Sequence, residues 1–107
     1  MNLECPYLKT QVELTDERES HIREKHPELL PQYREQIGRT LADPDEVRRD
    51  VRFPNSVLFS HWFPQVKGGK FIVVVIVADP PPAGRYWVVT AYVARQLSGG
   101  IVIWKRP

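Results

Sequence analysis

Residues 71–78 read Phe-Ile-Val-Val-Val-Ile-Val-Ala, an unbroken run of apolar and mostly β-branched side chains. The run is far shorter than the ~20 residues that a membrane-spanning helix needs, and its β-branched side chains favour a strand. Apolar residues on both faces are typical of a central strand that helices cover on at least one side. We therefore expect the centre of a β-sheet at residues 71–78.

Three other segments after residue 50 show the period of two that indicates strands. They are Ser56–Phe63, Tyr86–Ala94 and the short Ile101–Trp104. The connections between consecutive strands are short and rich in turn-forming residues, so they cannot hold a crossover helix. Consecutive strands should therefore pair antiparallel, which predicts a meander of about four strands.

The first half of the chain carries helical signals instead. Thr15 or Asp16 can cap a first helix, because their side chains accept hydrogen bonds from the first turn. This helix should end near His26, because Pro27 disfavours helical geometry in the residue before it. Before the helix, Leu3–Leu14 alternates imperfectly, so we interpret it as an extended lead-in or a short edge strand.

A second helix is expected to begin near Pro31, whose missing N–H costs nothing in a first turn. It would bury one apolar stripe, formed by Tyr33, Ile37 and Leu41. Asp43–Val47 repeats the cap-and-proline pattern and suggests a final short turn of helix. The chain of 107 residues shows no repeat or linker, so we expect a single domain over residues 1–107. Its predicted class is α+β, with the N-terminal helices packed on the antiparallel meander.

The single cysteine and the lack of long apolar segments indicate the cellular compartment of the protein. Cys5 is the only cysteine, so no internal disulfide can form, which fits a reducing cytoplasm. The N-terminus lacks the basic start and apolar core of a signal peptide, and no apolar run has the length of a membrane helix. We therefore expect a cytoplasmic protein that does not bind a membrane.

The net charge of +2 hides an uneven distribution. Residues 1–50 contain eight Lys and Arg against twelve Asp and Glu, whereas residues 51–107 contain seven against the single acid Asp79. The predicted sheet is therefore basic and could face an anion such as a nucleic-acid backbone. A plainer interpretation is that helices use Glu freely while strands avoid acidic residues.

The three histidines are the first candidates for chemistry. His21 and His26 are about 140° apart around a helix, so they share a face only if the helix frays at its end. They do not predict a zinc site, because Cys5 is the only thiol and no second pair of ligands is present. Gly68-Gly69-Lys70 resembles a hairpin turn more than a phosphate loop. We expect neither a metal nor a cofactor.

The strand at residues 86–94 carries hydroxyl groups. Simple alternation places Thr90 and Tyr92 on one face, together with Tyr86, Val88 and Ala94, and leaves a purely apolar face for the core. Neighbouring hydroxyls can bind a phosphate without carrying charge. Thr and Tyr are also good strand formers, so the pair has an ordinary structural explanation as well.

Two segments together resemble a known family: His21-Ile-Arg-Glu-Lys-His26-Pro-Glu28 and Val88-Val-Thr-Ala-Tyr92, in this order and separated by the Asp-Pro segment and the Val-rich strand. The combination, over residues 15–95, resembles the phage- and toxin-associated branch of the barnase/EndoU/colicin/RelE (BECR) nuclease superfamily. The resemblance implies a barnase-like α+β fold and metal-independent cleavage of RNA, with tRNA among the candidate substrates. It also implies a toxin-like or phage-associated role and an acidic antitoxin or immunity protein as partner.

The resemblance also implies roles for single residues. His21 is the first choice for general acid or base and His26 the second, because the unperturbed pKa of histidine is about 6.5. Thr90 and Tyr92 would hold the phosphate or assist proton transfer. The substrate-binding residues would be Lys70 as the preferred cation, Arg52 and Arg85 as further cations, and His61 if its strand face matches that of Thr90.

Two alternatives stay open. The chain could be an inactive RNA-binding or protein-interaction module on the same fold, in which Trp62, Trp87 and Trp104 stack on bases among basic side chains. It could also be an interaction domain that never touches nucleic acid, because residues 99–104 could pair as a terminal strand with another chain.

Overall fold

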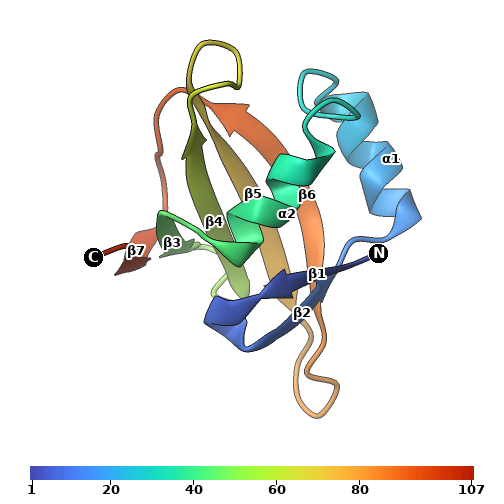
Figure 1. The fold of residues 1–107 in the computed structure, drawn as a ribbon. Helices are drawn as coiled ribbons and strands as arrows, with labels where there is room; N and C mark the ends of the chain where they lie inside the picture. The colour runs from blue at the N-terminus through green and yellow to red at the C-terminus, as the bar shows by residue number, and fades with distance from the viewer.

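The computed structural model describes residues 1–107. Seven strands form one curled sheet in the order β1-β2-β6-β5-β4-β3-β7, and two α-helices and a short 3-10 helix complete the fold (Figure 1). The elements are β1 (Asn2–Cys5), η1 (Pro6–Leu8), β2 (Thr10–Glu13), α1 (Asp16–Lys25), α2 (Arg34–Ala42), β3 (Glu46–Arg49), β4 (Ser56–Phe63), β5 (Lys70–Ala78), β6 (Tyr86–Ala94) and β7 (Ile101–Lys105).

The prediction of a central strand at residues 71–78 is confirmed. β5 pairs antiparallel with β4 on one side and with β6 on the other. Ile72, Val74 and Ile76 are buried and face the helices; we call this side of the sheet the core face. Val73 and Val75 lie on the opposite side, which we call the outer face. Both faces of the strand are therefore at least partly covered, as its apolar sequence requires.

The expected sheet of about four antiparallel strands is wrong. The structure is an α+β fold whose seven strands form a mixed sheet, because β2 runs parallel to β6 with Glu13 opposite Trp87. The N-terminal lead-in forms the antiparallel hairpin β1–β2. Residues 46–49 form β3 where a helical turn was expected, because Val47 is fully buried opposite Phe59 of β4. Pairing with a neighbouring strand overrides the local capping signal there.

The last strand also lies elsewhere than a meander would place it. β7 pairs with β3 at the far edge of the sheet and not with β6. The neighbour position beside β6 is already taken by β2. The chain therefore crosses from β6 to the opposite edge through residues 95–100 (Figure 1).

An irregularity in β6 changes which side chains face the core. Val75 lies opposite Thr90 and Ile76 lies opposite Val88, so Val89 has no partner across the ladder. This β-bulge reverses the alternation at one point of the strand. Val88 is consequently buried on the core face, and the predicted grouping of Val88 with Thr90 is wrong. Thr90 and Tyr92 remain together on the outer face.

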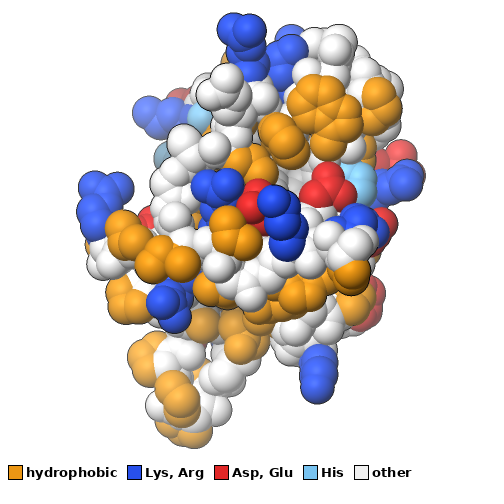
Figure 2. Space-filling model, turned by 90° about the vertical axis from the view of Figure 1, so that its left-hand side faces the viewer, with side chains coloured by type: hydrophobic (Ala, Val, Ile, Leu, Met, Phe, Trp, Pro, Cys, Tyr) orange, Lys and Arg blue, Asp and Glu red, His pale blue; other side chains and the backbone are white.

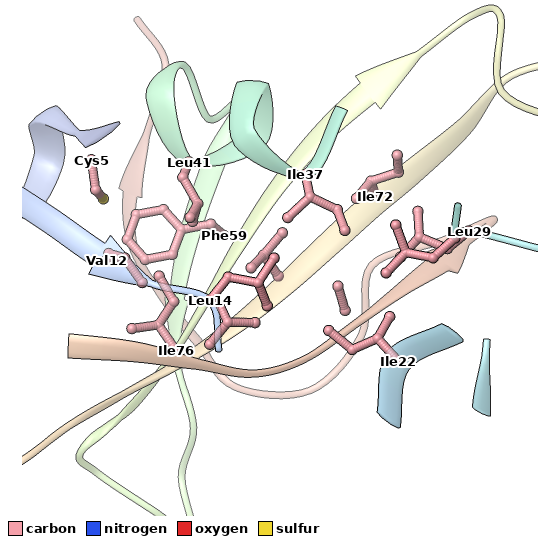
Figure 3. Packing of buried hydrophobic residues seen from close by; sticks show 14 of the residues in the cluster. Cys5, Val12, Leu14, Ile22, Leu29, Ile37, Leu41, Phe59, Ile72 and Ile76 are labelled. Carbon is pink, nitrogen blue, oxygen red and sulfur yellow. The ribbon is translucent and has the colours of Figure 1, made fainter. Parts of the chain in front are cut away.

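Both helices contribute to one core. Figure 3 shows Ile22 of α1 and Ile37 and Leu41 of α2 converging on the core-face side chains of the sheet. Thr15 caps α1 as predicted, since its Oγ accepts a hydrogen bond from the N–H of Arg18 at 3.1 Å. α2 begins at Arg34, later than expected, but buries the predicted stripe. No helix is long and apolar enough to cross a membrane.

We expect Gly100→Ala to destabilise the fold more than Gly99→Ala. Both glycines have positive φ values, 73° and 76°, which cost an L-residue about 1–2 kcal/mol. At Gly100 an added Cβ would also lie 2.8 Å from the carbonyl oxygen of Arg49, whereas at Gly99 it would meet open space. Urea unfolding of both variants measures the difference, and equal losses would contradict a close approach of β7 to β3.

We expect the unfolding free energy of the wild type to fall more steeply at alkaline pH than that of Cys5→Ala. Burial raises the pKa of the Cys5 thiol. The unfolded chain therefore loses this proton at a lower pH than the folded chain does. The contribution of the thiol to stability is complete below the ordinary thiol pKa and is lost as pH rises above about 8.5. The unfolding free energies of the two proteins, measured over this range, should show a steeper decline in the wild type.

Candidate functional site

Helix α1 lies alongside β6, and two contacts fix their alignment. The guanidinium carbon of Arg18 lies 5.9 Å from the ring centroid of Trp87. Eight residues later, the ring centroids of His26 and Tyr92 are 6.1 Å apart. Eight helical residues rise about 12 Å, close to the roughly 13–16 Å that β6 covers between its two contacts. The helix and strand therefore run side by side in the same direction, and we call their junction the α1–β6 seam.

His21 lies between the two contacts. It comes three residues after Arg18, a spacing that places both on one side of a helix, and it is half-buried. Helical rise places it about level with Val89 and Thr90. Of the four residues that the sequence nominated for catalysis, the structure brings His26 and Tyr92 into ring contact. His21 lies earlier on the same helix, and Thr90 lies two residues before Tyr92 on the same strand.

His26 is oriented by its neighbours. It is the C-cap of α1, and its backbone N–H donates to the carbonyl of Ile22. Its Nδ1 lies 3.4 Å from Oε1 of Glu28. The ring therefore lies beside Tyr92 with a carboxylate close to Nδ1.

Tyr92 also lines a hollow on the outer face. Its strand partner is Val73, whose partner on the next strand is Ser60. The connection at residues 95–100 supplies a wall, and the hollow between it and the sheet measures about 100 Å³. Its lining residues are Arg48, Leu58, Ser60, Val73, Tyr92, Ala94, Gln96, Leu97 and Ser98. A water molecule occupies about 30 Å³ of liquid, so the hollow has room for a few waters or one phosphate group.

Arg48 brings a positive charge to this hollow. Its Nη1 donates to the carbonyl of Gly99 at 3.0 Å, and its Nη2 lies 3.4 Å from Oε2 of Glu46. Its Nε is buried and has no hydrogen-bond partner. Buried donors are nearly always satisfied, so this atom is a donor that the fold itself leaves without an acceptor.

Burial raises the pKa of Tyr92 above the ordinary range of a phenol. Its hydroxyl therefore stays protonated at neutral and moderately alkaline pH. A neutral phenol can donate a hydrogen bond to an anion. Tyr92 is thus suited to be a donor and not a base.

The predicted cations lie elsewhere. The Nζ of Lys70 donates to the carbonyls of Lys67 and Gly69 in its own turn. Arg85 pairs with Glu13 beside Trp87, and Arg52 is exposed in the loop between β3 and β4. None of the three lines the hollow beside Tyr92.

His61 lies on the opposite side of the sheet from Thr90. It is paired with Ile72, a core-face residue, whereas Thr90 is paired with Val75 on the outer face. Its Nδ1 lies 2.6 Å from the carbonyl oxygen of Asp43 and 3.4 Å from Oδ1 of Asp45. The structure therefore does not bring His61 to the seam.

Sequence reasoning missed Arg48 and Ser60. Val47 and Phe59 are buried on the core face. Alternation along each strand would therefore have placed their neighbours Arg48 and Ser60 on the outer face. The first of these strands was predicted as helix, so this signal was not available. No group of three or more His, Cys, Asp or Glu side chains is arranged to hold a metal ion.

Comparisons of the chain with protein-family models, with curated proteins and with solved structures find no match.

We expect the phenol of Tyr92 to ionise above the ordinary pKa of tyrosine, because burial opposes formation of its phenolate. Ultraviolet absorbance during an alkaline titration should show one step above about pH 10 that Tyr92→Phe removes. Tyr86→Phe is the matched control, since Tyr86 lies on the same strand but packs against the core. Loss of the earliest step in Tyr92→Phe would contradict the burial of this hydroxyl.

Proposed function

We propose that the chain is a small metal-independent endoribonuclease that cleaves RNA by attack of the ribose 2′-hydroxyl on the adjacent phosphate. The observation that carries the proposal is the position of Tyr92, whose ring contacts His26 and also lines the hollow that contains Arg48. A neutral donor and a cation thus line a space the size of a phosphate, and a proton-transfer group lies against the ring of that donor.

The reaction needs three kinds of group. A base removes the 2′-hydroxyl proton, an acid protonates the leaving 5′-oxygen, and donors stabilise the charge on the phosphorane. Histidine can serve in both proton transfers near neutral pH. The products are a 2′,3′-cyclic phosphate and a free 5′-hydroxyl, so neither water nor a metal enters this step.

The residues divide these tasks by position. His26, with Nδ1 against Glu28, offers Nε2 as the base or acid nearest to the hollow. His21, one and a half turns earlier in the seam, is placed for the complementary proton transfer. Tyr92 and Arg48 donate hydrogen bonds to the phosphate oxygens. Thr90, on the same β-strand as Tyr92, offers a further hydroxyl to the phosphate. This assignment gives His26 the leading role that the family resemblance gave to His21.

The size of the hollow limits what it can bind. At about 100 Å³ it is smaller than the 300–1,000 Å³ of typical ligand pockets, so it would hold the phosphate alone. The ribose and bases would lie outside it along the seam. There the indole of Trp87 and the guanidinium of Arg18, which forms no ion pair, offer stacking and charge.

The cellular setting belongs to the same proposal. A toxin-like or phage-associated ribonuclease acts in the cytoplasm, where RNA is its substrate, and tRNA is a compact candidate. Such an activity requires an inhibitor in the producing cell, and we propose an acidic antitoxin or immunity protein as partner.

Cleavage of mixed RNA and of tRNA in the presence of EDTA tests the proposal. We expect His26→Ala to lower the rate by about a hundredfold or more, as is usual for loss of a general acid or base. Tyr92→Phe should lower it by about a hundredfold, because one donor to the developing charge is lost.

Tyr86→Phe should leave cleavage unchanged, since this hydroxyl is outside the hollow. His21→Ala determines which histidine dominates, because a larger loss there than in His26→Ala would restore the order that the resemblance implies. Absence of cleavage of every RNA by the wild type would count decisively against the proposal.

A second candidate is an RNA-binding module without catalysis, and the guanidinium groups beside Trp87 favour it. Arg18 and Arg85 lie 5.9 and 6.0 Å from the indole centroid. RNA affinity that survives His26→Ala but falls on Arg18→Ala, with no cleavage, would support this function instead.

A further inference from the structure

Five of the eight exposed large apolar side chains lie on β7 or in the loop that follows β3. Ile101, Val102 and Ile103 of β7 are 48%, 45% and 41% exposed. Val51 and Phe53, in the loop that follows β3, are more exposed still. Ile101 lies opposite Arg49, the last residue of β3, so the strand and loop are neighbours. We call these five residues the edge patch, and the proposed nuclease site makes no use of them.

The patch lies on an open sheet edge. β7 is the last strand in the sheet order and pairs only with β3, so its other side carries unpaired main-chain N–H and C=O groups. The opposite edge strand, β1, differs because α2 packs against it. Neither α-helix packs against β7, although Tyr7 of η1 contacts Trp104 with ring centroids 5.9 Å apart (Figure 1).

The surroundings of the patch are basic. Arg49, Arg52 and Lys105 are exposed, and none forms an ion pair within the chain.

The acidic side chains near the patch are already engaged. Asp50 accepts hydrogen bonds from the backbone N–H groups of Arg52 and Phe53, and Glu46, opposite Lys105, pairs with Arg48. Asp43 and Asp45 pair with Arg106. Figure 2, which views the molecule from the side of β7, shows hydrophobic side chains with basic and acidic side chains among them.

These features select the kind of occupant. A second copy of the chain, paired edge to edge, would bring two sets of unpaired cations together. RNA would satisfy the cations but would leave the apolar side chains exposed to water. An extended polypeptide with both apolar and acidic side chains satisfies the whole surface.

We propose that β7 is the docking edge for an extended, acidic segment of a partner protein, which adds to the sheet as an eighth strand. Its main chain would pair with β7, its apolar side chains would cover Ile101–Ile103, and its carboxylates would face Arg49, Arg52 and Lys105. The inference does not depend on ribonuclease activity, because none of the five residues of the edge patch lines the hollow beside Tyr92.

A tethered strand tests this proposal on the full chain. The chain is extended after Pro107 by a flexible Gly/Ser linker of about ten residues and a strand of about six residues, since a short linker supplies an effective concentration near the millimolar range. One tail alternates Ile with Glu, and the matched tail alternates Ile with Lys. Hydrogen exchange of the β7 amides, measured by NMR, reports the added strand.

We expect the acidic tail to slow exchange at residues 101–105 by about tenfold or more relative to the unextended chain, and the basic tail to have no such effect. Ile103→Lys and Arg49→Glu should each remove the protection; both side chains are exposed, so the fold should tolerate them. Lys25→Glu, an exposed charge change on α1, should preserve it.

Three results would overturn the proposal. The first is absence of protection by the acidic tail, and the second is equal protection by both tails. The third is self-association of the unextended chain in sedimentation, abolished by Ile103→Lys, which would identify a second copy as the occupant.

Discussion

The central constraint on this molecule is that β5 is apolar on both faces. Ile72, Val74 and Ile76 require the helices on one side, and Val73, only 3% exposed, requires a cover on the other. The connection at residues 95–100 provides that cover, with Leu97 beside Val73 in the lining of the hollow. The same crossing carries the chain to the far edge of the sheet. One hydrophobic requirement therefore accounts for the core, the hollow next to Tyr92 and the exposed position of β7.

Sequence patterns identified the elements that carry strong local signals. β4, β5 and β6, the cap at Thr15 and the end of α1 near His26 follow from periodicity and from proline and capping chemistry. Features that depend on distant partners were missed. β3 has only four residues, and its strand conformation rests on the pairing of Val47 with Phe59. The bulge at Val89 has no signature in a strand of ordinary β-formers.

The candidate site was predictable to a similar extent. The segments with His26 and Tyr92 could be nominated because their residue types suit proton transfer and phosphate binding. The supporting cation could not, because charge alone does not show which side chains are already engaged. Lys70 is bound by its own turn, whereas Arg48, which local patterns assigned to no role, retains an unpaired buried Nε. Hydrogen-bond satisfaction is a property of the folded chain and not of the residue list.

The crossing from β6 to β7 also has a consequence for folding. β7 joins its only partner, β3, across half of the chain length, so this contact carries a large loop-closure cost. Arg106, directly after β7, reinforces the contact by pairing with Asp43 and Asp45, which precede β3. The connection at residues 95–100, which covers the outer face of β5 and forms the wall beside Tyr92, is held at one end by β6 and at the other by this pairing. The shape of the pocket therefore depends on the docking of β7 at the far edge of the sheet.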